Sequence, residues 1–161
     1  MSTIADLRRN AAVGAIAANS FCMLATSSAA NRPHVAGVLY VLVHRRLYIN
    51  TMRTSRKARN VAENEWMAVC VAVASPDLPD MPPFTAMFQG TAALLTPEDS
   101  EISALVSSGR LAPITSHGEL ELPDSCFIRV TPGRRLITFG FGLSEDDLVN
   151  DPLSANGSVE W

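Results

Sequence analysis

A short basic segment carries the clearest chemical signal in the sequence: Asn50-Thr-Met-Arg-Thr-Ser-Arg-Lys-Ala-Arg-Asn60. Seven consecutive positions hold four of the thirteen basic residues of the chain, namely Arg53, Arg56, Lys57 and Arg59. Lys57 is the only lysine. Guanidinium and ammonium groups form strong, charge-assisted hydrogen bonds with phosphate oxygens. The composition of the segment therefore suggests that it binds a phosphate.

The secondary structure expected for this segment supports the same interpretation. The pattern predicts a strand that ends at Asn50 or Thr51 and a helix that begins near Thr54 or Ser55. Cations are unfavourable at the start of a helix, where the helix dipole already places positive potential. An anion would compensate, and the free backbone N–H groups and hydroxyls of a helix start are suited to hold one. The sequence thus predicts a phosphate site at this strand–helix junction.

The charge of the chain is unevenly distributed. Residues 1–60 hold nine basic side chains and one acid, whereas residues 61–161 hold four basic side chains and fifteen acids. A split of this kind is also typical of nucleic-acid-binding proteins. Here only Tyr48 lies among the basic residues to stack on a base, and the acidic remainder of the chain would repel phosphates. We therefore expect no nucleic-acid partner.

Several other classes of protein are disfavoured. The 161 residues, 47% apolar and 18% charged, fit one globular domain with a sizeable core. No apolar run is long enough to span a membrane, and three dispersed cysteines without an export signal suggest free thiols in the cytoplasm. The three histidines are scattered, so no metal site is expected. The sequence contains no P-loop, no nucleophile elbow and no zinc-protease motif.

The elements expected around the basic segment are those of a mainly β, α+β domain. Apolar patterns predict strands at 21–26, 33–43, 46–50, 65–73, 84–95, 126–131 and 135–139, and helices at 3–19, 54–64 and 96–109. Residues 65–73 are apolar on both faces, which predicts that this strand contacts a helix or a partner subunit on its outer side. We expect an antiparallel barrel of six or seven strands with flanking helices. It would occupy residues 1–143, with an acidic, turn-rich tail at 144–161.

Three segments in this order resemble the pyridoxamine 5′-phosphate oxidase-like superfamily of flavin-binding split β-barrels. They are Leu24-Ala-Thr-Ser-Ser-Ala-Ala-Asn-Arg-Pro-His-Val-Ala-Gly-Val38, Arg46-Leu-Tyr-Ile-Asn-Thr51 and Ser55-Arg-Lys-Ala-Arg-Asn60. The strand that contains Phe88-Gln-Gly90 is also similar. The resemblance covers roughly residues 5–140, and its most specific part is the Ser-Arg-Lys segment with the preceding Thr51.

The resemblance implies that FMN binds at the interface of a homodimer. The residues that match its phosphate ligands are Thr51, Ser55, Arg56 and Lys57. The residues whose backbone would follow the isoalloxazine ring are Val35, Ala36, Gly37 and Val38. Asn50 would contact the ring or the ribityl arm, and Thr85 or Gln89 would reach the flavin from the other subunit.

The function expected from this resemblance is an FMN-dependent oxidoreductase that acts on an unidentified small molecule. The flavin would carry the electrons, and no side chain is identified as a general acid or base. Asn31 and Gly37 replace the glycine and proline that are common in the family, and its C-terminal arginine–histidine motif for vitamin B6 substrates is not visible. The alternatives are a reductase that uses the deazaflavin coenzyme on the same fold, and a flavin- or haem-binding protein without enzymatic activity.

Overall fold

The computed structural model describes residues 1–74 and 80–161. In these residues nine strands join one sheet, in the order β2-β1-β5-β6-β7-β4-β3, with β8 pairing with β6 and β9. All pairings are antiparallel. The strands are β1 Phe21–Ser27, β2 Pro33–Leu39, β3 Val41–Val43, β4 Arg46–Met52, β5 Trp66–Val73, β6 Phe84–Leu95, β7 Ser125–Pro132, β8 Arg135–Phe139 and β9 Asn156–Glu160.

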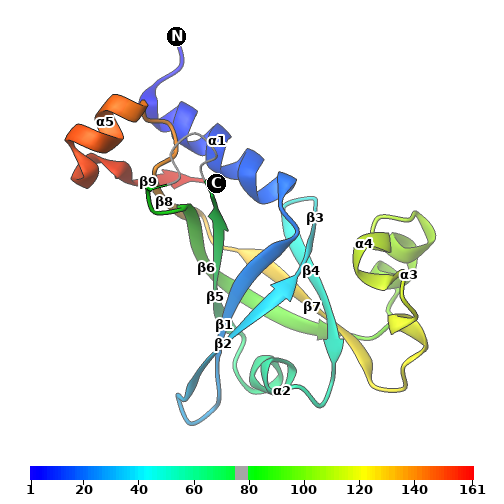
Figure 1. Cartoon of the computed structure of the whole chain (residues 1–161). Helices are drawn as coiled ribbons and strands as arrows, with labels where there is room; N and C mark the ends of the chain where they lie inside the picture. The colour runs from blue at the N-terminus through cyan, green and yellow to red at the C-terminus, as the bar shows by residue number, and fades with distance from the viewer. Residues whose placement is uncertain (75–79) are drawn as a thin grey trace.

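Helices flank this sheet, which is curled into the half-barrel of a split β-barrel, so the expected α+β fold class is confirmed (Figure 1). The α-helices are α1 Ile4–Ala18, α2 Arg56–Glu63, α3 Ser100–Ser107, α4 Ala112–Thr115 and α5 Glu145–Asn150. Two short 3₁₀ helices are η1 Glu119–Glu121 and η2 Pro152–Ala155. Figure 1 shows α1 and α5 at one end of the molecule, α2 at the other end, and α3 and α4 at the side. Within the described residues, none of the helices has both the length and the apolar character that a membrane crossing requires.

The structure has two more strands than the seven expected, and each of the two has a cause in particular residues. The single strand predicted at 33–43 is interrupted at Tyr40, whose backbone N–H donates to Ser20 O and whose buried hydroxyl donates to Ile16 O. The first bond continues the β1–β2 pairing by one residue, and the second ties the Tyr40 side chain to α1. The segment 144–161 adds β9, which pairs with β8 along five residues. The final residue, Trp161, packs edge-on against Phe88 of the core, with ring centroids 5.0 Å apart.

The turn before β4 is a two-residue hairpin, as predicted. His44 and Arg45 both have positive φ angles, 47° and 63°, which is the backbone that favours a tight hairpin between twisted strands. The resulting register pairs Leu42 with Leu47 and Val41 with Tyr48. It places Leu47 and Ile49 in the main core and Tyr48 on the opposite face. The hairpin therefore fixes which side chains of β4 point away from the core, up to the junction with α2.

The helices α3 and α4 cover the other face of β4 and β7. Their core is a second apolar cluster that includes Phe127, Ile102, Leu111, Ile114 and Tyr48. At its edge the carboxylate of Glu101 accepts hydrogen bonds from Tyr48, Arg46 and Arg129, the last at 2.6 Å. Burial alone would raise the pKa of Glu101, but these hydrogen bonds and the two arginine charges outweigh it, so this pKa lies below its ordinary value. Glu101 thus anchors α3 to the sheet as a charged group.

Gly90 allows β6 to lie against β7 without a side chain between them. A Cβ atom at this position would lie 2.2 Å from the carbonyl oxygen of Thr131, which is backbone and cannot move aside. We expect Gly90→Ala to destabilise the fold by about 1–3 kcal/mol through overpacking, measured as a lower urea midpoint at unchanged m-value. Gly14→Ala in α1 is the control, because nothing lies within 4 Å of its Cβ position. Equal midpoints for the two variants would contradict the close approach of β6 and β7.

Candidate cofactor site

The junction between β4 and α2 has the structure that the basic segment predicts. Ser55 is the N-cap of α2, and its Oγ accepts the backbone N–H of Ala58 at 3.3 Å. The hydroxyl of Thr51, at the end of β4, donates to Ser55 Oγ at 3.2 Å. The N–H groups of Arg56 and Lys57 lie in the first turn, where no intrahelical acceptor exists. Hydroxyls and free backbone donors therefore converge at the start of α2.

The cations of this segment point to two sides of α2. Arg53 and Lys57 lie near Cys126 of β7: burial raises the pKa of this thiol, and their two charges act in the opposite direction. Lys57 is half-buried, whereas Arg53 is exposed. The backbone N–H of Arg53 donates to Asp124 O at 2.8 Å, which ties the junction to the start of β7. We call Thr51, Ser55, Arg56 and Lys57 the clamp.

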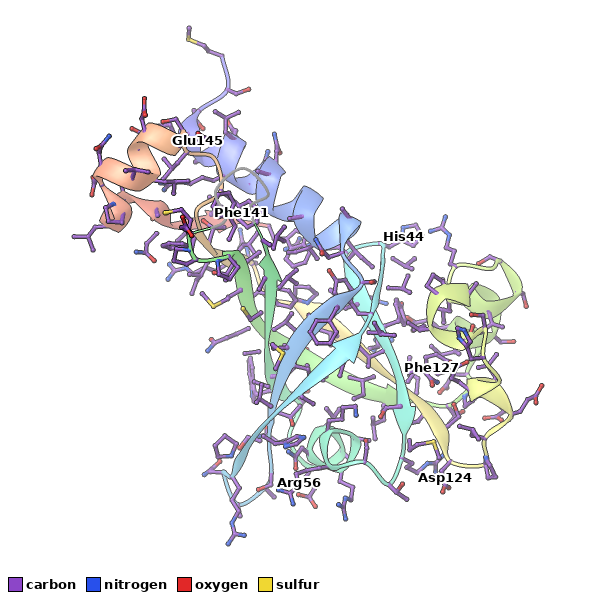
Figure 2. The ribbon with its side chains drawn as sticks, in the orientation of Figure 1. His44, Arg56, Asp124, Phe127, Phe141 and Glu145 are labelled. Carbon is purple, nitrogen blue, oxygen red and sulfur yellow. The ribbon has the colours of Figure 1, made fainter. Side chains whose placement is uncertain are left out.

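Arg56 and Arg59 are on the other side of α2, toward the turn between β1 and β2. With Arg32 from that turn they line a hollow of about 420 Å³, which we call the basic hollow; its remaining lining residues are Ser28, Ala29, Ala30, Pro33, Asn60 and Glu63. Figure 2 shows Arg56 beside α2 at the lower end of the molecule. Within residues 1–74 and 80–161, neither these arginines nor Arg53 and Lys57 form an ion pair shorter than 4.0 Å. The junction therefore has a surplus of positive charge.

Two asparagines of the segment have structural partners. The side-chain amide of Asn50 donates to Ser125 Oγ at 3.0 Å and to Cys126 O at 3.3 Å, which joins β4 to β7. The buried Asn60 donates to Thr26 Oγ1 at 3.0 Å and fixes α2 to β1. The amide N–H₂ of Asn50 is therefore already bonded within the chain, while its side-chain oxygen has no hydrogen-bond partner within the described residues.

The expected ring-binding strand β2 is at an end of the strand order, so one of its edges is unpaired within the described residues. Its side chains alternate: Val35 and Gly37 are exposed, Ala36 is half-buried and Val38 is buried. The ring of Phe21 covers Gly37, at 2.6 Å from where a Cβ atom would lie. Backbone N–H and C=O groups of an unpaired edge are available to a ligand.

Thr85 and Gln89 lie on β6, outside the β4–α2 junction. They alternate with buried Ala86 and Phe88 and are on the side of the sheet that faces away from the core. Cross-strand pairs place Thr85 beside Ala72 and Gln89 beside Ala68. The structure therefore places Thr51, Ser55, Arg56 and Lys57 at one strand–helix junction, with Arg56 and Lys57 on different sides of α2. It leaves Thr85 and Gln89 on the side of the sheet that faces away from the core.

This surface is strongly apolar, and we call it the outer face. Register connects Gly37, Met23, Cys70, Met87 and Ile137 in one row across five strands. Its exposed apolar side chains are Phe21, Met23, Val35, Leu39, Trp66 and Ile137. A hollow of about 610 Å³ lies on it, and a second hollow shares Ala25, Trp66, Ala68 and Gln89 with the first. The second hollow also reaches Pro33, which lines the basic hollow as well.

A family profile described as pyridoxamine 5′-phosphate oxidase matches residues 9–137, most of the chain. This chain belongs to that family. The comparison with curated proteins found no match. Membership agrees with the resemblance of the three sequence segments.

Solved structures with this fold include proteins described as binding different ligands. HutZ, a haem storage protein of Vibrio cholerae, aligns with a TM-score of 0.69 at 19% identity, over 81% of this chain and 93% of that one. A FAD-binding protein of Mesorhizobium loti gives 0.60 at 17% identity, over 76% and 87%. An F420 reductase gives 0.51 at 18% identity, over 74% and 91%. At these identities the similarity shows the fold.

The structure adds Trp66 and Arg32 to the residues singled out from the sequence. Trp66 begins β5 with 64% of its surface exposed, and it lines both hollows of the outer face. The outer side of residues 65–73 was expected to contact a helix or a partner subunit; within the described residues Trp66 on that side is exposed, and contact with a partner subunit stays a prediction. Arg32 lies far from the basic segment in sequence, and only the fold of the β1–β2 turn against α2 brings it to Arg56 and Arg59. No local pattern could have identified it.

Proposed function

We propose that this protein is a homodimer that binds FMN at the subunit interface and catalyses a redox reaction on an unidentified small molecule. The observation that carries the proposal is the clamp: two hydroxyls, free helix N–H groups and unpaired cations meet at one strand–helix junction. A phosphate dianion would accept hydrogen bonds from the Ser55 hydroxyl and the helix N–H groups and would neutralise the cations, while Thr51, which already donates to Ser55 Oγ, supports the cap. Family membership supports the same ligand.

The chemistry of the donor set fits the phosphate end of a flavin. The hydroxyl of Ser55 caps α2 through its oxygen, so its hydrogen remains free to donate to a phosphate oxygen. The N–H groups of Arg56 and Lys57 would donate along the helix axis, and their side chains would neutralise the charge. Asn60 and Ser55 hold α2 in place, so these donors are positioned before the ligand arrives.

The ring would lie beside the unpaired edge of β2. Backbone groups of Val35–Val38 would hydrogen-bond its polar edge there, and Asn50 would contact the ribityl arm through its side-chain oxygen. Thr85 or Gln89 on the outer face would then reach the flavin of the partner subunit. Exposed apolar patches rimmed by polar residues are typical of protein interfaces, which supports the outer face as the dimer surface.

When bound, FMN would supply hydride or electron transfer, and the chain itself would bind and orient it and exclude water. The outer face would exclude water through its apolar side chains once the second subunit covers it. The F420 reductase and HutZ folds support two alternatives in the same site: the deazaflavin coenzyme and, without turnover, haem. The deazaflavin alternative uses the same clamp, because that coenzyme also carries a phosphate.

Titration of the purified protein tests the proposal. We expect FMN to bind at one per subunit, with quenching of its fluorescence, and riboflavin to bind at least about tenfold more weakly because it lacks the phosphate. Separate titrations with the deazaflavin coenzyme and with haemin test the alternatives. Binding of the deazaflavin coenzyme alone would identify that coenzyme, instead of FMN, as the cofactor. Binding of haemin alone, or of none of these ligands, would overturn the proposal.

A further inference from the structure

A hollow of about 450 Å³ lies where α3 covers the beginning of β4, and we call it the α3 hollow. Its lining residues come from the β3–β4 turn, from β4 and from α3, and are His44, Arg46, Tyr48, Glu101, Ala104 and Leu105. On β4, Arg46 and Tyr48 alternate with Leu47, which belongs to the main core. On α3, the three lining residues recur at the three- and four-residue spacing of one helix face. The α3 hollow therefore has one wall from the sheet and one from the helix.

The α3 hollow is separate from the proposed cofactor site. Figure 2 shows His44 and Arg56 beyond opposite ends of β4. Arg46 begins this strand and Thr51 lies near its end, which places them about 17 Å apart along the strand. The lining of the α3 hollow shares no residue with the clamp, with the basic hollow or with the hollows of the outer face. A ligand in the α3 hollow would therefore not compete with FMN.

Two arginines supply positive charge to the α3 hollow. Arg46 lines it directly, with 46% of its side chain exposed. Arg110, which follows α3, places Nη1 3.1 Å from Nε2 of His44. A guanidinium has donors only, so the ring of His44 accepts this hydrogen bond and leaves the charge of Arg110 in place. Within the part of the chain that the structure describes, no carboxylate lies within 4.0 Å of Arg110.

The acid that lines the α3 hollow is already engaged by other groups. Glu101 accepts hydrogen bonds from Tyr48 and, at 2.6 Å, from Arg129 of β7. Its contact with Arg46 is longer, at 3.4 Å. One carboxylate thus faces three arginines, and the nearest of them is Arg129. The α3 hollow therefore keeps a surplus of positive charge, which Arg46 and Arg110 present to a ligand.

We propose that the α3 hollow binds a small organic anion. The oxyanion group of this ligand would pair with Arg46 and Arg110, since guanidinium groups form charge-assisted hydrogen bonds with carboxylate and phosphate oxygens alike. The apolar part of the ligand would pack against Ala104 and Leu105 on the helix wall. The volume of the hollow is within the range of small-molecule sites, about 300–1,000 Å³. This site does not depend on the proposed cofactor.

Isothermal titration calorimetry with simple aromatic anions tests the proposal. We expect phenyl phosphate or benzoate to bind at one per subunit, and the tighter of the two identifies the oxyanion group. Inorganic phosphate and acetate lack the apolar part and should bind at least about tenfold more weakly. Benzyl alcohol has the apolar part without the charge and should also bind at least about tenfold more weakly. Failure of both aromatic anions to bind, or equal affinity for benzyl alcohol, would overturn the proposal.

Two arginine variants test the cationic part of the site. Arg46→Gln and Arg110→Gln should each weaken binding of the aromatic anion by about tenfold or more, the effect of one charge-assisted contact. Both side chains are exposed, so the variants should fold. Arg9→Gln is the matched control, because Arg9 on α1 has 47% of its side chain exposed, close to the value for Arg46. Equal affinity in all three variants would contradict the assignment of Arg46 and Arg110.

A pair of helix variants shows whether the anion is in the α3 hollow. Ala104→Glu places a negative charge on the helix wall and should abolish binding, whereas Ser103→Glu places the same charge on a neighbouring face and should weaken binding less than about threefold. Both positions are exposed and glutamate favours helices, so both variants should fold. An equal effect of the two substitutions would place the anion elsewhere, the clamp included, and would overturn the proposal. FMN affinity should be unchanged in Ala104→Glu, so this result is distinct from a failure of the proposed function.

Discussion

Replacing Lys57 with glutamine is expected to weaken FMN binding about 10- to 100-fold, since one charge-assisted hydrogen bond contributes roughly 1.5–3 kcal/mol. Lys57 is half-buried in the first turn of α2, and no described carboxylate lies within ion-pair distance of it. Its ammonium group is therefore available to the phosphate and partly protected from solvent screening. Fluorescence titration of the purified variant with FMN measures the loss.

Two controls make this result specific. Riboflavin has the same ring without the phosphate, so its affinity should be unchanged in Lys57→Gln. Lys57→Arg keeps the charge and should retain more FMN affinity than the glutamine variant, although its planar donor group has a different geometry. A loss that is equal for FMN and riboflavin would show that Lys57 supports the fold of the site and does not contact the phosphate.

The sequence was sufficient to predict the elements that depend on residues close together in the chain. His44 and Arg45 form the turn between the strands predicted at 33–43 and 46–50, and the N-cap of α2 is Ser55, one of the two residues at which this helix was predicted to begin. The apolar outer side of β5 was visible in Trp66–Val73 because both sets of alternating residues are apolar. The fold class followed from the spacing of these elements, and family membership confirms it.

Features that depend on contacts distant in sequence could not be predicted in this way. Tyr40 ends β2 because its hydroxyl reaches the end of α1, and nothing in the apolar run 33–43 indicates this bond. β9 forms because β8 offers an edge, although residues 156–160 include a glycine and several polar residues. The division of the cations between two faces of α2 does follow from helical periodicity. That these cations form a hollow with a third arginine depends on Arg32, and only the tertiary fold places Arg32 beside Arg56 and Arg59.

The outer face favours self-association of the protein in solution. Six large apolar side chains on it are between 38% and 64% exposed, and they lie on adjacent strands, so water would contact a continuous apolar surface in an isolated subunit. Isolated exposed apolar residues are common, but a continuous patch is typical of an interface. A two-fold dimer would cover the same patch on both copies. It would also bring Thr85 and Gln89 of each copy toward the partner.

Met23→Lys is therefore expected to weaken self-association by roughly 100-fold or more, because an unpaired charge buried in an interface costs about 3–5 kcal/mol. Met23 occupies the row between Gly37 and Cys70, and it is already partly exposed in the subunit, so the variant should fold. Leu153→Lys is the matched control, because Leu153 is 83% exposed in η2, outside the outer face. Sedimentation velocity over a concentration series measures the self-association of both variants. Since FMN is proposed to bind between subunits, its affinity should fall together with association in Met23→Lys, and a dimer of unchanged strength would contradict the assignment of the outer face.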